Sequence, residues 1–150
     1  MIAIRPYEPQ DFPAIQAAHD PARRQELANA GLEAAFLPLP VAAEREELFD
    51  YTVEVAVLNG QVVGFVAFTG EELAWLYVRP DCQRQGVGTA LAKHALAQMA
   101  PGPKTVEVLV GNEPARQLYR RLGFVQEELL HGQMPGNERF SVTVYAMTMA

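Results

Sequence analysis

The stretch ELAWLYVRPDCQRQGVGTALAKHALAQMA, residues 72–100, decides the fold that the sequence predicts. The apolar run at 73–78 has the length and composition of a buried strand, and Arg79-Pro80-Asp81 ends it. The loop 83–88 then opens directly into a helix, in which small and apolar residues recur at the spacing of one helical face: Gly88, Leu91, Ala92, Ala95, Leu96 and Met99. Pro101-Gly102-Pro103 ends this helix.

The start of this helix is a candidate anion-binding site. The first N–H groups of a helix have no partner within it and carry a partial positive charge, so phosphate oxygens can accept hydrogen bonds from them. Gly86 and Gly88 would let a bulky anion approach these groups. An ordinary strand-to-helix turn with glycines for packing is equally compatible with the pattern. The loop is neither a Walker loop, because no lysine precedes Thr89, nor a dinucleotide fingerprint, because residue 91 is leucine.

The whole chain has the size and composition of one globular domain, residues 1–150. Its formal net charge of −6 argues against nucleic acid as a partner, because binding a phosphate backbone requires a basic surface. The only cysteine, Cys82, excludes a thiolate cluster, and His19, His94 and His131 lack ligand spacing, so we expect no metal. No apolar run is long enough to span a membrane and the N-terminus does not resemble a signal peptide. We therefore expect a cytoplasmic protein without a membrane partner.

Hydrophobic patterning and turn signals predict strands and helices along the rest of the chain. The predicted strands are 1–7, 53–58, 61–69, 72–78, 105–110, 124–130 and 140–149, with a hairpin at Asn59-Gly60 and a polar loop at 131–139. The predicted helices are 11–18, capped by Asp11, 20–31, with Pro21 in its first turn, 88–100, and 113–122. Between them, Pro38 and Pro40 argue against a continuous helix in 32–50, whose apolar residues either pack or line a pocket.

A second informative stretch is VGNEPARQLYRRLGF, residues 110–124. Asn112 can cap the helix, Pro114 is tolerated in its first turn, and Gly123 can end it in a left-handed conformation. The apolar stripe follows helical spacing: Ala115, Leu118, Tyr119 and Leu122.

Together the two stretches resemble the GCN5-related N-acetyltransferase (GNAT) family. The family's loop motif Gln/Arg-x-x-Gly-x-Gly/Ala is matched by Gln83-x-x-Gly86-x-Gly88, and its N-x-x-A-x-x-L-Y-x-x-x-G-F motif is matched over 112–124. The resemblance implies a single-domain α/β (α+β) fold. It would contain a mixed, mostly antiparallel sheet of about seven strands with a splayed parallel pair, flanked by about four helices.

The resemblance also implies acetyl-coenzyme A as cosubstrate. Its pyrophosphate would lie on the loop amides and its pantetheine arm between the strands 72–78 and 105–110, with the backbone N–H near Val78 facing the thioester oxygen. The residues implied in cofactor binding are Leu76, Tyr77, Val78, Gln83, Arg84, Gln85, Gly86, Val87, Gly88, Thr89, Asn112 and Tyr119.

Two residues are candidates for acid–base chemistry. Tyr119 matches the family's frequent general acid, although without that match an amphipathic helix would favour a core tyrosine. Glu72 stands where some members carry a general base, and simple alternation would place it on the same side of the strand as Leu76 and Val78. Two acids at a turn, Glu71 and Glu72, are also compatible with a solvated turn, in which case ordered water would serve as the base.

These features predict an enzyme that transfers acetyl from acetyl-coenzyme A to a primary amine of a small molecule, peptide or protein by direct attack. The alternative is a non-catalytic module of the same fold that senses acyl-coenzyme A or binds a partner. The acceptor is not determined by the sequence, and the homodimer that is common in the family is compatible with it.

Overall fold

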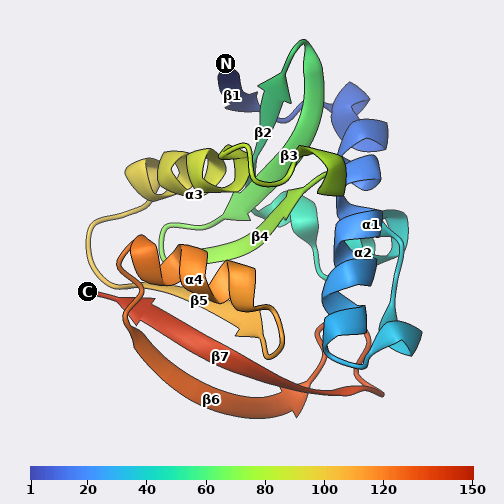
Figure 1. The fold of residues 1–150 in the computed structure, drawn as a ribbon, viewed down its shortest axis with the longest axis vertical. Coiled ribbons are helices and arrows are strands. Elements are labelled where there is room, and N and C mark those ends of the chain that lie inside the picture. The colour runs from blue at the N-terminus through green and yellow to red at the C-terminus, as the bar shows by residue number, and fades with distance from the viewer.

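A computed structural model describes residues 1–150 and contains one seven-stranded sheet in the order β1-β2-β3-β4-β5-β7-β6 (Figure 1). Only β4 and β5 are parallel, which confirms the predicted class of mixed, mostly antiparallel α/β fold. The strands are β1 (Ile2–Pro6), β2 (Thr52–Leu58), β3 (Gln61–Phe68), β4 (Glu72–Val78), β5 (Lys104–Leu109), β6 (Gln126–Gln133) and β7 (Ser141–Met149). The helices are α1 (Phe12–Asn29), α2 (Leu39–Arg45), α3 (Val87–Gln98) and α4 (Glu113–Arg121).

The structure has four helices, as predicted. However, two predicted helices are one in the structure, and one observed helix was not predicted. The predicted helices 11–18 and 20–31 form one helix, α1, which continues through Pro21. Proline lacks the N–H that would bond one turn back, yet buried Ile15 and Leu27 on either side of it hold both halves of the helix in place. The remaining helix, α2, is short and lies in segment 32–50, where the prolines argued only against a continuous helix. Pro40 occupies its first turn, where the missing N–H has no helical partner anyway.

Two local expectations at the ends of elements need correction. Asp11 occupies the N-cap position of α1, but its side chain makes no capping hydrogen bond to that helix; its carboxylate accepts hydrogen bonds from the guanidinium of Arg5 at 2.8 and 3.0 Å and from the N–H of Glu8 at 2.9 Å. Strand β6 extends to Gln133, so the predicted polar loop at 131–139 is shorter and begins at Met134. The hairpin is as predicted, with Asn59 and Gly60 both at positive φ (52° and 78°).

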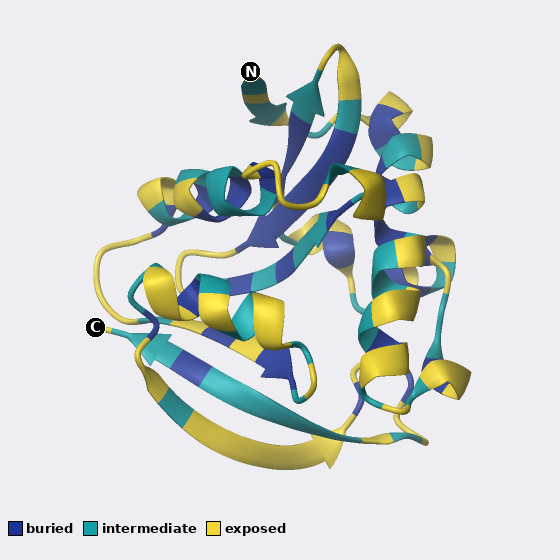
Figure 2. Cartoon of the chain, viewed as in Figure 1, coloured by how far each residue is buried: buried dark blue, intermediate teal, exposed yellow.

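Helices cover both faces of the sheet, and the core lies between helix and strand on each side (Figure 2). On one face α3 and α4 bury residues such as Leu91 and Tyr119 against Val66 and Val106. On the other, α1 and α2 pack against Phe65 and Trp75. Strand β6 is an edge strand whose residues are mostly exposed.

The parallel pair in the middle of the sheet is splayed, as expected. Strands β4 and β5 pair only at Glu72 with Thr105 and at Leu73 with Val106, and the rest of each strand diverges from the other. Strand β5 instead pairs along its whole length with β7, and β4 pairs with β3 at Leu73 and from Trp75 to Val78. Figure 1 shows the two strands separating toward their C-terminal ends. The divergence leaves backbone groups of β4 without a strand partner on that side.

Candidate active site

A β-bulge in β4 decides which side chains face which side of the sheet. Ala67 pairs with Trp75 and Phe68 with Leu73, so Ala74 is an extra residue without a partner in β3. The side-chain alternation reverses at this point. Trp75 and Tyr77 consequently pack on the α1 and α2 face, whereas Leu76 and Val78 pack on the α3 face.

Because of the bulge, the expectation that Glu72 lies on the side of Leu76 and Val78 is wrong. Its side chain lines the same cavity as Trp75 and Tyr77, on the α1 and α2 face. Simple alternation along the sequence could not reveal this, because it assumes that each residue of β4 has its own partner.

A small cavity of about 60 Å³ lies in the gap between the splayed strands. It is lined by residues of α1, β4, β5 and α4, among them Leu76, Asn112 and Tyr119. The N–H of Arg79 donates to the carbonyl of Val63 in β3 at 2.8 Å, so alternation along β4 turns the N–H of Val78 away from β3 and toward the gap. The gap therefore presents both a backbone donor and the Tyr119 ring.

The loop before α3 has the geometry of an anion cradle. Gly86 adopts φ 84° as the residue before the helix, and a Cβ there would meet no atom within 4 Å. Its carbonyl accepts the first hydrogen bond of the helix, from the N–H of Ala90 at 3.0 Å. The N–H groups of residues 87–89 precede this bond and therefore have no carbonyl partner within the helix. The loop lies against the end of β4, where the amide of Gln83 donates to the carbonyl of Val78 at 3.4 Å.

Tyr119 is buried on α4 and faces the gap. Its ring meets Phe124 edge to face, with centroids 5.8 Å apart. Burial raises the pKa of Tyr119 above its ordinary value, and the negative charge of Glu26 adds to the effect. The phenol therefore keeps its proton at neutral pH, which suits a hydrogen-bond donor and excludes a base. Asn112 caps α4 as predicted, with its side-chain oxygen accepting from the N–H of Ala115 at 3.4 Å.

Glu26 of α1 is a central residue of the site that the sequence did not indicate. Its carboxylate accepts from Arg23 at 2.6 Å, from the Tyr77 hydroxyl at 3.1 Å and from the Asn112 amide at 3.0 Å. It thereby connects α1 to β4 on one side of the gap and to the start of α4 on the other. Tyr77 and Asn112 are 51 and 86 residues away along the chain, so no local motif could have identified this contact.

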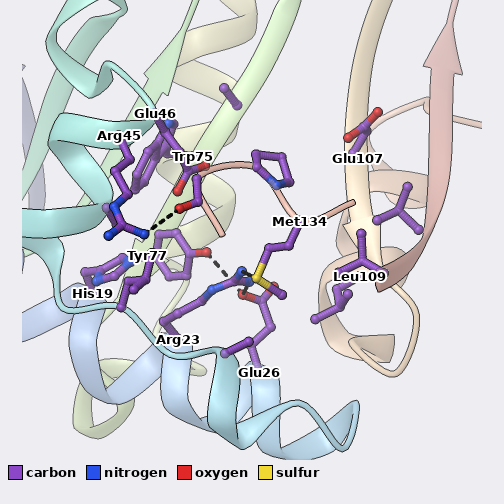
Figure 3. Close-up of a pocket in the computed structure, with 18 of the residues that line it drawn as sticks. His19, Arg23, Glu26, Arg45, Glu46, Trp75, Tyr77, Glu107, Leu109 and Met134 are labelled. Carbon is purple, nitrogen blue, oxygen red and sulfur yellow. Dashed lines mark hydrogen bonds and ion pairs between the residues drawn. The ribbon is translucent and has the colours of Figure 1, made fainter. Parts of the chain in front are cut away.

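A larger cavity of about 440 Å³ adjoins the small one (Figure 3). Residues of α1, α2, β4, β5 and the 134–138 loop line it, and five residues line both cavities: Glu26, Leu73, Ala74, Tyr77 and Glu107. Its charged side chains are mostly acidic: Glu26, Glu46, Glu72, Glu107 and Glu138, with Arg23 and Arg45. Glu72 lines this larger cavity only, and so is not brought to the cavity that holds Tyr119.

Several ionisable groups of the larger cavity are perturbed by its environment. Burial raises the pKa of Glu46 to about 7, opposed by Arg23 and reinforced by Glu138. Burial and the nearby charge of Glu107 raise the pKa of Glu72. Burial also lowers the pKa of His19, despite its hydrogen bond to Asp20. Carboxylates with raised pKa values are better proton acceptors than ordinary ones.

No group of three or more His, Cys, Asp or Glu side chains is arranged to hold a metal ion. None of the helices combines the length and the apolar composition needed to cross a membrane.

Comparison with solved structures identifies the class of fold. The chain superposes with a TM-score of 0.80 on a GCN5-related N-acetyltransferase from Rhodopseudomonas palustris, at 24% identity over 99% of this chain and 94% of that one. The PaiA N-acetyltransferase from Thermoplasma acidophilum, solved in complex with coenzyme A, gives a TM-score of 0.66 at 15% identity over 99% and 98% of the chains. The fold is that of the N-acetyltransferases.

Sequence comparison then identifies the family. The family model for the acetyltransferase (GNAT) domain matches residues 49–126, which is slightly more than half of the chain. The chain therefore belongs to the GNAT family, as its two motifs predicted.

The chain aligns with only part of the length of its curated relatives. The peptidyl-lysine N-acetyltransferase YjaB of Salmonella typhimurium is 40% identical over 95 residues, which cover 59% of this chain and 64% of that protein. An uncharacterized N-acetyltransferase of Methanocaldococcus jannaschii is 35% identical over 92 residues, covering 52% of this chain and 41% of that one. The alignments thus span less than two thirds of either relative.

Proposed function

We propose that this protein is an acetyl-coenzyme A-dependent N-acetyltransferase, with the chain 1–150 as a single catalytic domain. The observation that carries the proposal is the pair of adjoining cavities: the small one lies between the splayed strands and contains Tyr119, and the larger one is acidic. A thioester held in the first would meet an amine that enters from the second. The five residues common to both cavities mark the place where the two substrates would meet.

The residues present suit acetyl-coenzyme A. The open space at Gly86 and the unpaired N–H groups of 87–89 fit a pyrophosphate, with Gln83, Arg84, Gln85, Gly88 and Thr89 around it. Leu76, Tyr77, Val78 and Asn112 border the gap in which the pantetheine arm would run. When bound, acetyl-coenzyme A supplies the acetyl group as an activated thioester.

Three groups of this chain would assist the transfer. The N–H of Val78 faces the gap and would donate to the oxygen on which negative charge develops. Glu72 lines the larger cavity only, so with its raised pKa it would accept a proton from the incoming ammonium through ordered water, before the neutral nitrogen attacks. The new N–C bond replaces the C–S bond, the electron pair of that bond leaves with the sulfur, and the nitrogen releases its second proton to solvent.

Tyr119 would stabilise the departing sulfur. A thiol has a pKa of about 8.5, and the pKa of this phenol is raised above about 10, so complete proton transfer to the thiolate is unfavourable. A hydrogen bond from the hydroxyl to the sulfur has no such cost. Tyr119 is therefore best described as a donor that lowers the energy of the developing thiolate, which finally takes its proton from solvent.

Thiol release from acetyl-coenzyme A with a panel of amines tests the proposal. The panel includes peptides with free lysine side chains, because the Salmonella relative is named a peptidyl-lysine N-acetyltransferase, together with small mono- and diamines. We expect release that depends on both the enzyme and one class of amine. Tight binding of acetyl-coenzyme A without release for any amine would support the alternative, a sensor of acyl-coenzyme A.

A further inference from the structure

The larger cavity holds more negative charge than its own cations neutralise. Five carboxylates line the cavity. That of Glu26 already accepts hydrogen bonds from three donors, one of them Arg23. The other four, Glu46, Glu72, Glu107 and Glu138, form no ion pair within the protein. The remaining guanidinium, Arg45, donates to the carbonyl of Gly136 at 3.0 Å. The cavity is thus suited to a cation.

The four carboxylates without an ion pair form two pairs of like charge at different places in the cavity, and Glu138 also accepts a hydrogen bond from the N–H of Gly136 at 2.8 Å. Glu72 and Glu107 come from the neighbouring strands β4 and β5, and Glu107 also lines the small cavity. Glu46 and Glu138 come from the end of α2 and from the loop before β7, and neither lines the small cavity. Figure 3 shows Glu46 and Glu107 on opposite walls. The two carboxylates of each pair repel each other, and a cation beside them would relieve that repulsion.

His19 provides an independent indication of the ligand. Its side chain is only 2% exposed, yet it lines the cavity, and its Nδ1 lies 2.8 Å from the carboxylate of Asp20. With the pKa lowered by burial the ring is neutral, and the carboxylate favours the tautomer with the proton on Nδ1. Nε2 then carries a lone pair and no protein hydrogen bond, so it can only accept a hydrogen bond, as from an ammonium group.

Aromatic side chains also line the cavity. Trp75, Tyr77 and Tyr51 line the cavity, and His19 contacts the Tyr77 ring edge to face, with centroids 4.9 Å apart. Aromatic faces attract ammonium groups and also pack against methylene chains. An aliphatic chain with a positive charge at each end suits both the aromatic side chains and the two acidic pairs.

We infer that the larger cavity binds a dicationic amine, a linear diamine or polyamine, with the amino group to be acetylated beside Glu72 and Glu107 and a second ammonium group beside Glu46 and Glu138. This inference rests on the proposed function for the reacting end. The distant pair, Glu46 and Glu138, determines specificity and takes no part in the chemistry. Free lysine is disfavoured, because its carboxylate would lie in an acidic cavity.

Binding without acetyl-coenzyme A tests the site independently of catalysis. Putrescine and butylamine share the same four-carbon chain and differ by one ammonium group, so their effects on the melting temperature are titrated side by side at about pH 8. We expect putrescine to bind roughly tenfold more tightly, equivalent to one partly buried ion pair. Glu46→Gln combined with Glu138→Gln should reduce this preference to near unity. Glu44→Gln is the matched control, because Glu44 is exposed on α2 and lies outside the cavity.

The corresponding kinetic measurement separates this inference from the proposed function. We expect kcat/KM for putrescine to exceed that for butylamine roughly tenfold, and the double variant to lose this ratio through KM with little change in kcat. Equal affinity of the two amines, or a preference retained in the double variant, would overturn the inference even if acetyl transfer occurs. Selective diamine binding without any thiol release would support the site and overturn the proposed enzymatic function.

Discussion

At the scale of single residues, Tyr119 is a site where packing and chemistry can be separated experimentally. Tyr119→Phe removes the hydroxyl and retains the ring that packs on Phe124. We expect unfolding midpoints and acetyl-coenzyme A affinity to change little. Turnover should fall on the order of 10²-fold, in kcat and kcat/KM alike, because a donor to the developing thiolate acts mainly in the transition state.

The leaving group provides the control for Tyr119. An acetyl thioester of a more acidic thiol needs less stabilisation at sulfur, so the defect of Tyr119→Phe should shrink with it. A variant with wild-type turnover, or one that is unfolded, would instead make Tyr119 a core residue.

Glu46 makes a pH-dependent contribution to stability. Its pKa is about 7 in the folded protein and about 4.5 when unperturbed, so between these values the folded state binds the extra proton. The stabilisation is full below about pH 4.5 and is lost as the pH rises through 7. The groups that act on Glu46 or are affected by it are Arg23, Glu138, Tyr51 and Tyr77.

Urea unfolding of wild type and Glu46→Gln across this range measures the effect. The variant should gain stability over wild type with rising pH, by on the order of 1–3 kcal/mol above pH 7. Glu44→Gln, with its exposed carboxylate, should follow the wild-type curve. A constant difference between wild type and Glu46→Gln at all pH values would show that the Glu46 carboxylate is not perturbed.

At the scale of elements, sequence reasoning succeeded where the signal is local. The strand at 72–78, the helix that follows the glycine loop, the Asn59-Gly60 hairpin and the cap at Asn112 each depend on a few consecutive residues, and the structure has all of them. The splayed strand pair was expected only through the family resemblance, because divergence of two strands leaves no periodic pattern.

The failures at this scale have a common physical origin in tertiary contacts. Pro21 locally favours a new helix start, but packing on both sides of it keeps α1 continuous. The bulge at Ala74 carries no glycine or proline that would mark it, yet it moves Glu72 to the other face of the sheet. Glu26 had no recognisable role in the sequence, since its partners Tyr77 and Asn112 come from distant segments.

At the scale of the molecule, the sheet consists of two parts, β1–β4 and β5–β7, that pair with each other through only two residue pairs. Glu26 reinforces this junction from α1, through Tyr77 on one part and Asn112 on the other. A cosubstrate lying in the gap would contact both parts and would bind only the folded state. Its binding should therefore stabilise the whole domain and should protect the amides of β4 that lack a strand partner.

Acetyl-coenzyme A should accordingly raise the melting temperature with the logarithm of its concentration above Kd. A hundredfold excess over Kd corresponds to about 2.7 kcal/mol, or roughly 5–10 °C for a domain of this size. Gly88→Glu should abolish the shift, because Gly88 lies in the first turn of α3 and a carboxylate there would occupy and repel the pyrophosphate site. Hydrogen exchange should slow at Leu76 and Val78 on binding, and only in the wild type. A full shift in Gly88→Glu would place the cosubstrate elsewhere, and a shift without protection at these amides would mean that it does not enter the gap.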